Sequence, residues 1–395
     1  MSKLQELIDQ YCPNGVEYKP LGDKDVSLMQ RGTSLTKKDS TEGVYPVISG
    51  GKTPAFYCNQ YNRDGETITV AGSGAGAGYV QYWNEPIFVC DAFSIKGANE
   101  VSTKYLYYCL TNLQDKIYAT KKGGGVPHVH ISSIDKFFIP IPPPLVQEEI
   151  VKILDRFAEY AAELQAELQA RQEQYEYYRN KLLAFNGIWG GIQSVIWMKM
   201  SEIGTFVRGK RFVRTDIVND GVPCIHYGDM YTYYGLYATK SKGMLRNELA
   251  SKMRYAQKND VVIVAAGENK EDIGIGMAWL GDEPAAVHDA CFIFKSDLYP
   301  QYVSHYLRTK YYHKQIVKHV SEGKICSISA KGLGNAIIPI PPYEEQVRIA
   351  TLLNKFDALV SDLVQGLPAE IAAVQEQYEY YRDKLLSFPK YKLSA

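Results

Sequence analysis

The segment FFIPIPPPLVQEEIVKILDRF (137–157) recurs 199 residues later as AIIPIPPYEEQVRIATLLNKF (336–356). Further along the chain, QEQYEYYRNKLLAF (172–185) recurs 203 residues later as QEQYEYYRDKLLSF (375–388). Two long matches in the same order indicate a tandem duplication. We therefore expect two copies of one unit, each made of a globular segment, a proline-rich joint and a helix.

The helical part of each copy places apolar residues at alternating steps of four and three, which is the seam of a coiled coil. Two such seams in one chain most simply pack on each other, and they are antiparallel if a pseudo-twofold axis relates the copies. The alternative is two unrelated surface helices, which would show a wider apolar stripe. In the first copy the apolar seam residues, with Arg171 filling the one gap, are Ile150, Leu154, Phe157, Ala161, Leu164, Leu168, Tyr175, Tyr178, Leu182 and Phe185.

The two repeat offsets differ by four residues, so the second helix carries an insertion near Gly366–Glu370. Four residues add about one helical turn, or roughly 6 Å of rise. Because Gly366 and Pro368 both disfavour a helix interior, we expect a kink or a short break at this point.

The globular segments share a skeleton but diverge between its landmarks, and the second has about 21 more residues. Both mix β-like runs with one later helix, over about 104–119 and 301–319. The predicted fold is therefore α+β, a tandem duplication of a mixed α/β domain followed by a long helix. The shared landmarks are Arg31-Gly32 with Arg208-Gly209, 45–48 with 222–225, and Asp91-Ala92 with Asp289-Ala290. The predicted domains are 1–139 and 198–338, the helical segments are 140–187 and 339–390 (the latter with the C-terminal tail), and 188–197 is a linker.

The formal charge is zero, with 44 basic and 44 acidic residues, which at first argues against a nucleic-acid binder. The charge is unevenly distributed, however. Residues 1–144 are neutral, 145–187 carry −3, 188–343 carry +5 and 344–395 carry −2. Acidic helices therefore offset a basic second domain. Basic clusters interleaved with tyrosines favour a surface that contacts phosphates and stacks on bases, and a solvated face is the alternative.

None of the motifs that we tested indicates catalysis. The run GSGAGAG (72–78) lacks the last glycine of G-x-G-x-x-G, so a turn between strands is the better interpretation. Residues 340–343, IPPY, resemble the N-P-P-Y of amino-methyltransferases but have Ile in place of the polar residue. His128-x-His130 has no further metal ligand nearby, so a DNA-facing or structural role is favoured. Asp91 and Asp289 are interpreted as turn or capping carboxylates, with a catalytic acid as the lesser alternative.

The seven cysteines are scattered without a C-x-x-C pair, which indicates buried thiols in a reducing cytoplasm. Residues 1–11 are polar, so we expect no secretory signal. The most apolar patch, 188–198, is too short to span a bilayer. We therefore expect a cytoplasmic protein with no membrane association.

Taken together, the duplication, YEYYR(N/D)KLL, IPIPP, QGLPAEI (365–371) and CPNGVEYKPLGD (12–23) resemble the specificity subunits of type I restriction-modification systems. The resemblance covers essentially the whole chain. It implies that the globular segments are target recognition domains, each reading one half of a bipartite site in double-stranded DNA, and that the helices are the conserved spacers between them.

The resemblance also implies the partners. Two methylation subunits would carry S-adenosylmethionine and modify adenine, and restriction subunits, which translocate and cleave DNA, would use ATP and Mg²⁺. No cofactor or metal is expected on this chain, which would not be an enzyme. From their positions, the candidate DNA-binding residues are Arg31, Lys121, Lys122, Gly124, His128, His130, Arg208, Lys210, Arg211, Arg214, Lys318, Lys324 and Ser327. The candidate partner-binding residues are Tyr177, Arg179, Tyr380 and Arg382.

Two other functions stay open at this point. One is a coiled-coil adaptor, which would not read DNA at all, and the other is the recognition module of a stand-alone DNA methyltransferase. A self-contained methyltransferase or nuclease would need catalytic motifs that this sequence lacks. The divergence of the two domains, both of which carry basic loops, favours DNA reading.

Overall fold

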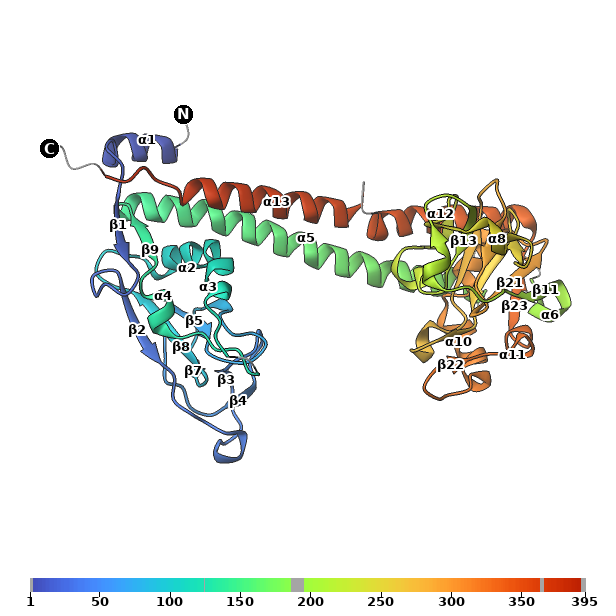
Figure 1. Cartoon of the computed structure of the whole chain (residues 1–395), viewed down its shortest axis with the longest axis horizontal. Coiled ribbons are helices and arrows are strands. Elements are labelled where there is room, and N and C mark those ends of the chain that lie inside the picture. The colour runs from blue at the N-terminus through green and yellow to red at the C-terminus, as the bar shows by residue number, and fades with distance from the viewer. Residues whose placement is uncertain (1–2, 124, 186–194, 363–365, 392–395) are drawn as a thin grey trace. The chain divides into compact units, whose positions relative to one another are not determined.

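The computed structural model describes residues 3–123, 125–185, 195–362 and 366–391 (Figure 1). The chain divides into two compact units. Residues 1–163 and 371–395 form the first unit, and residues 164–370 form the second. Each unit therefore contains one globular domain and one half of each long helical segment.

The first domain is built on two β-sheets. Its strands are β2 (Ser27–Arg31), β3 (Tyr45–Ile48), β4 (Phe56–Cys58), β5 (Thr67–Ala71), β6 (Val80–Trp83), β7 (Phe88–Val89) and β8 (Ala92–Gly97). One sheet is antiparallel with the order β2-β8-β5-β6, and the other has the order β4-β3-β7, in which β3 and β7 are parallel. All five residues of β5, TITVA, are buried, as expected of a β-branched central strand.

The second domain repeats this plan with additional strands. Its strands are β11 (Gly204–Arg208), β12 (Ile217–Val218), β13 (Val222–Ile225), β14 (Tyr237–Ala238), β15 (Gly243–Leu245), β16 (Tyr255–Ala256), β17 (Val261–Val264), β19 (Gly276–Trp279), β20 (Ala285–Val287) and β21 (Cys291–Ser296). The sheet orders are β11-β21-β17-β19-β14 and β12-β15-β13-β20-β16. The counterparts of β3 and β7, which are β13 and β20, are again parallel. Strands β12, β14, β15 and β16 come from the region that holds the extra residues of the second copy.

The proline-rich joints form the second strand of a two-stranded ribbon in each unit. In the first unit β9 (Phe138–Ile141) pairs with β1 (Glu17–Pro20), and in the second β23 (Ile337–Ile340) pairs with β10 (Ile196–Lys199). The second domain therefore begins at Ile196, inside the range that we predicted as a linker. Most of that range, 188–194, lies outside the described residues.

The later helix of each domain is two short helices rather than one, so the prediction of single helices over 104–119 and 301–319 was wrong in this detail. They are α2 (Thr103–Asn112) and α3 (Gln114–Ala119) in the first domain and α9 (Pro300–Tyr306) and α10 (Lys310–Ile316) in the second. The break in the second domain has a local cause, because the Thr309 side chain accepts a hydrogen bond from the Tyr312 N–H and so caps a new helix.

The long helices follow the predicted seam. Helix α5 (Pro144–Ala184) is continuous, whereas the second helix is divided into α12 (Tyr343–Ser361) and α13 (Leu367–Leu385). The predicted break is confirmed. A Cβ at Gly366 would lie 2.6 Å from the carbonyl oxygen of Ala358, so the chain approaches the end of α12 too closely for a side chain at this position.

The helices are antiparallel, because each unit combines the first half of one with the second half of the other. In the first unit α5 and α13 lie side by side (Figure 1), and the rings of Phe157 and Tyr381 stack. In the second unit the rings of Tyr178 and Phe356 stack. The buried seam residues include Ile150, Leu154, Leu164, Tyr175, Ile349, Leu353, Val360 and Val374.

The remaining elements are short. They are α1 (Lys3–Tyr11), α4 (Ile131–Ile134), α6 (Met200–Ile203), α7 (Asp229–Thr232), α8 (Asn247–Ala250), α11 (Ala330–Gly334), β18 (Ala266–Gly267), β22 (Cys326–Ser327) and the 3-10 turns Lys37–Asp39, Arg214–Asp216, Lys270–Asp272 and Val317–His319. Among the helices of the described ranges, none combines the length and the apolar character that a membrane span requires.

Candidate nucleic-acid interface

An Arg-Gly pair ends β2 in the first domain and β11 in the second. Its glycine lies against the backbone of the strand connection that precedes β8 or β21. A Cβ would lie 2.1 Å from the carbonyl oxygen of Cys90 at Gly32, and 2.2 Å from that of His288 at Gly209. Only glycine permits this close approach. The arginine before it is therefore held in the same place in each domain, at the end of β2 in the first and of β11 in the second.

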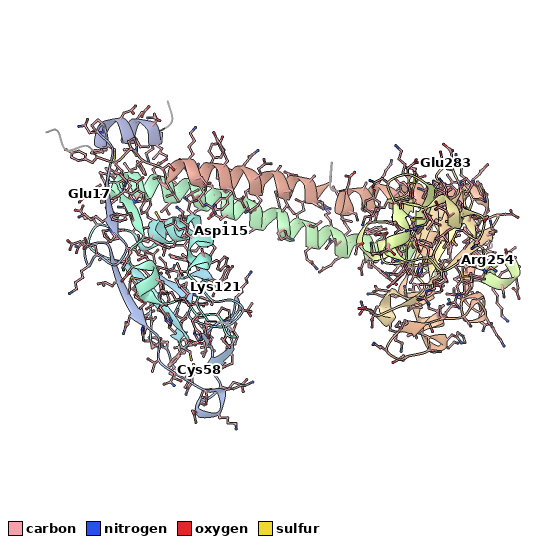
Figure 2. All side chains as sticks on the ribbon, viewed as in Figure 1. Glu17, Cys58, Asp115, Lys121, Arg254 and Glu283 are labelled. Atoms are coloured by element: carbon pink, nitrogen blue, oxygen red, sulfur yellow. The ribbon has the colours of Figure 1, made fainter. Side chains whose placement is uncertain are left out.

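A loop beside this strand end carries four of the candidates in the first domain. The backbones of Lys122 and His128 exchange hydrogen bonds of 2.9 and 2.8 Å, and His128 also forms a bridge with Ser73. The rings of His128 and His130 stack with centroids 6.1 Å apart. Lys121, labelled in Figure 2, lies 4.2 Å above the ring of Tyr118. The structure thus brings these four candidates together; Gly124 lies outside the described residues.

The second domain repeats the loop with different side chains. Ser321 and Ser327, each 199 positions beyond Lys122 and His128, exchange backbone hydrogen bonds of 2.8 and 3.0 Å. Strand β22 of this loop pairs with β18. Lys324 and Lys318 are exposed on the loop and on the turn before it, whereas Ser327 is half-buried.

An aspartate lies between the Arg-Gly pair and the loop in both domains. The Ser73 hydroxyl donates to the Asp91 carboxylate, and the Gly72 N–H donates to the Asp91 carbonyl oxygen at 3.0 Å. In the second domain Arg208 Nε donates to the carbonyl oxygen of Asp289 at 2.9 Å. Both backbone carbonyls therefore accept hydrogen bonds from the same surface. The role predicted for the two carboxylates, as turn or capping groups, stays a prediction, and neither aspartate was among the DNA-binding candidates. Their recurrence in both copies was the available signal.

We call this combined surface the basic edge. In the first domain it consists of residues 31–32, 73, 91, 121–123 and 125–130, and in the second of residues 208–214, 289 and 318–327.

Further cations lie on or next to the basic edge of the second domain. Lys210 and Arg211 are exposed. The buried carboxylate of Asp229 forms ion pairs with Arg214 at 3.7 Å and with Lys242 at 3.0 Å. These ion pairs restrict the positions of both cations. Sequence reasoning missed Arg254, labelled in Figure 2, which donates to the carbonyl oxygen of Arg208 at 2.6 Å.

Two histidines pack against Phe212, which belongs to the basic edge of the second domain. The rings of His226 and His288 are 4.8 Å apart, and the ring of Phe212 lies against both. Burial, with the nearby charges of His288 and Arg214, lowers the pKa of His226 to about 4. His226 is therefore neutral at pH 7.

The glycine run 72–78 is the predicted turn between β5 and β6. Gly74 and Gly78 have φ of +78° and +83°, which glycine adopts without strain.

Within the described ranges, no group of three or more His, Cys, Asp or Glu side chains is arranged to hold a metal ion. All seven cysteines are free, and six of them are buried, as expected of structural thiols.

The four partner-binding candidates differ in exposure, because the two tyrosines face solvent and the two arginines pack against the protein. Tyr177 and Tyr380 are 57% and 60% exposed. The arginines pack inward instead. Arg179 lies 5.2 Å above the ring of Tyr175, and Arg382 donates from Nε to the Asn112 side-chain oxygen at 3.1 Å. The exposed aromatic rings, rather than the guanidinium groups, are therefore available to another protein.

Comparisons with known proteins identify one family. Residues 13–174 and 196–373 match the model of the type I restriction modification DNA specificity domain. The chain is similar to the specificity subunit of the type I restriction enzyme EcoR124I/EcoR124II of Escherichia coli, with 29% identity over 99% of this chain and 98% of that protein.

Two solved structures share the fold. One is the S subunit of a type I restriction-modification system from M. genitalium, with 18% identity, a TM-score of 0.59 and coverage of 96% of this chain and 97% of that one. The other is a chain of a type I R-M system described for its complex assembly and conformational transition. It has 16% identity, a TM-score of 0.62 and coverage of 95% and 98%.

Proposed function

The chain belongs to the family of type I restriction-modification DNA specificity proteins, and from this premise we propose that it is the DNA-recognition subunit of such a complex. It is not an enzyme itself. Each domain reads one half of a bipartite site in double-stranded DNA through its basic edge, and the paired helices set the unread gap between the halves.

One observation carries the proposal. The same backbone framework, an Arg-Gly strand end beside a paired loop, occurs in both domains but presents different side chains. Lys122 and His128 of the first domain are replaced by Ser321 and Ser327 in the second. Base edges are distinguished by the donors and acceptors that reach them, so an invariant frame with different side chains supports the reading of two different sequences.

The helices supply the surface for other subunits. Tyr177 and Tyr380 occupy equivalent places in the two copies, and both rings are exposed. Aromatic rings of this kind are enriched in protein interfaces. Two equivalent surfaces support the binding of two methylation subunits, which supply S-adenosylmethionine, and then of restriction subunits that use ATP and Mg²⁺. The free thiols are compatible with a cytoplasmic complex.

Co-expression with the cognate methylation subunit, followed by single-molecule methylome sequencing, tests the proposal. We expect one split motif with methyl groups on adenine. Replacement of Lys122 by Ala should weaken methylation and should change base preference only in the half-site that the first domain reads, since a side chain that reaches a base edge carries sequence information. The matched control is Lys258→Ala, which removes an exposed lysine that pairs with Asp282 and should change nothing. A complex that forms but methylates no split motif would support the adaptor alternative, and methylation by this chain alone would support the methyltransferase alternative.

A further inference from the structure

We propose that Asp91 is a base-reading residue, and that its carboxylate accepts a hydrogen bond from the exocyclic amino group of a cytosine in the half-site of the first domain. This inference rests on the proposed function. It concerns the Asp91 side chain, because the Asp91 backbone carbonyl already accepts a hydrogen bond from the Gly72 N–H.

The position of Asp91 is fixed on both sides. On one side Gly32, which follows Arg31, donates from its N–H to the carbonyl oxygen of Ala92 at 2.9 Å. On the other side Ser73 donates its hydroxyl to the Asp91 carboxylate, and Ser73 forms a backbone bridge with His128. Asp91 is therefore in the middle of the basic edge and not at its periphery.

The side chain of Asp91 is exposed although it is held in place. Its Oδ2 accepts from the Ser73 hydroxyl, which leaves the lone pairs of Oδ1 available to a ligand. A carboxylate fixed by a short neighbouring side chain loses little rotamer freedom when it binds. This preorganisation is what a residue that reads a base requires.

The charge of Asp91 determines which part of DNA it can face. A carboxylate among cations that contact phosphates is itself repelled by the phosphates, so it favours binding only when a hydrogen-bond donor of a base faces it. In the major groove, guanine presents only acceptors and thymine an acceptor and a methyl group. Adenine presents an acceptor beside its amino group, whereas cytosine presents the amino donor alone. Cytosine is therefore the base that this carboxylate accepts best.

The equivalent residue of the second domain provides a matched comparison. Asp289 also lies between an Arg-Gly pair and the loop, and its side chain is 37% exposed. It has His288 beside it, with 3.2 Å between Nδ1 and Oδ1, in place of a serine hydroxyl. A substitution at Asp289 can alter only the half-site that the second domain reads.

Methylome sequencing of complexes with the Asp91→Asn variant tests the inference. Asn offers both a donor and an acceptor and pairs well with adenine. We expect one position of the first half-site to change from cytosine alone to cytosine or adenine, with discrimination there reduced about tenfold or more. The second half-site and the gap should stay unchanged. Ser73→Ala, which keeps the carboxylate but frees it, should slow methylation without changing the preferred base.

Two controls make the result decisive. Asp289→Asn should leave the first half-site unaltered. If the Asp91→Asn variant methylates no DNA, its base preference can be measured by binding instead. Duplexes randomised in the first half-site are incubated with the complex, and the bound duplexes are sequenced. An unchanged first half-site in either assay, or equal loss of binding for all sequences, would overturn the inference. A wild-type complex without a split motif would instead overturn the proposed function.

Discussion

The ring of Phe157 stacks on the ring of Tyr381, with centroids 5.5 Å apart and planes inclined by 26°. The second unit repeats the pair with Phe356 and Tyr178, at 5.8 Å and the same angle. Phe356 is the counterpart of Phe157 and Tyr381 that of Tyr178, so the contact is made twice with the roles of the helices exchanged. This exchange is what a pseudo-twofold relation between the copies requires.

Each stacked pair should contribute a measurable coupling energy. Truncation of Phe157 or Tyr381 to Ala should lower the free energy of local unfolding of the helix pair in the first unit by about 1–2 kcal/mol. The loss of stability is smaller than for truncation of a fully buried ring, because both rings are partly exposed. The double variant should reveal a coupling of about 1 kcal/mol. Hydrogen exchange in α13 measures it. Phe157→Ala with Tyr178→Ala, which belong to different pairs, should be additive, and zero coupling for the stacked pair would contradict the prediction.

The same relation predicts that half-chains associate with themselves. In a chain of residues 1–190, Phe157 of one copy can stack on Tyr178 of a second copy, because Tyr178 corresponds to Tyr381. We expect a dimer by light scattering, and a palindromic split motif when it is combined with the methylation subunit. The half-chain 191–395 should behave in the same way. Phe157→Asp should give monomers, whereas Tyr177→Asp, at an exposed ring outside the seam, should leave the dimer intact. Monomeric wild-type halves would count against the pseudo-twofold relation.

The duplication, the seam and the helix break could be predicted from the sequence because each depends on periodicity or on local chemistry. The break needed only Gly366 and Pro368, which act through the backbone. The internal break between α9 and α10 was missed because it depends on one capping side chain, that of Thr309, within an otherwise helical stretch.

The candidate site could be predicted only in part. Loop residues such as Lys122 and His128 could be placed from the repeat offset. The inward packing of Arg382 could not, because it depends on Asn112, which is 270 residues away in the chain. Likewise, the connection of Asp91 to the loop runs through Ser73, a contact that no spacing rule indicates.

The insertion in the second helix should act as part of a molecular ruler. Deletion of Gly366–Ala369 removes about one helical turn, or roughly 6 Å of rise, which corresponds to about two base pairs at 3.4 Å each. We expect methylome sequencing to show a gap shorter by about two base pairs with both half-sites preserved. Pro368→Ala, which changes the same segment without shortening it, should keep the gap. Retained activity with an unchanged gap after the deletion would refute the ruler.

The second unit should be selectively sensitive to acid because of His305. Its Nε2 lies 2.9 Å from the Asn354 side-chain oxygen and its Nδ1 3.3 Å from the Tyr175 hydroxyl, and the side chain is fully buried. Burial, with the charges of Arg179 and Arg308, lowers the pKa of His305 to about 4. In the first unit Tyr108 occupies the equivalent place and bonds to Asp155, so that site has no histidine to protonate.

Because the pKa of His305 is lower in the folded chain than the usual 6.5, the unfolded chain binds the proton more readily. The stabilisation is complete above pH 6.5 and is lost as the pH falls from 6.5 towards 4, by about 1.4 kcal/mol for each pH unit. His226 acts in the same direction. Urea unfolding followed by tryptophan fluorescence measures this in a Trp83→Phe background, which leaves tryptophans only in the second unit. We expect a lower midpoint at pH 5 than at pH 7, and a smaller difference after His305→Gln but not after the surface substitution His130→Gln. Equal midpoints at the two pH values would show that His305 is not held neutral by the fold.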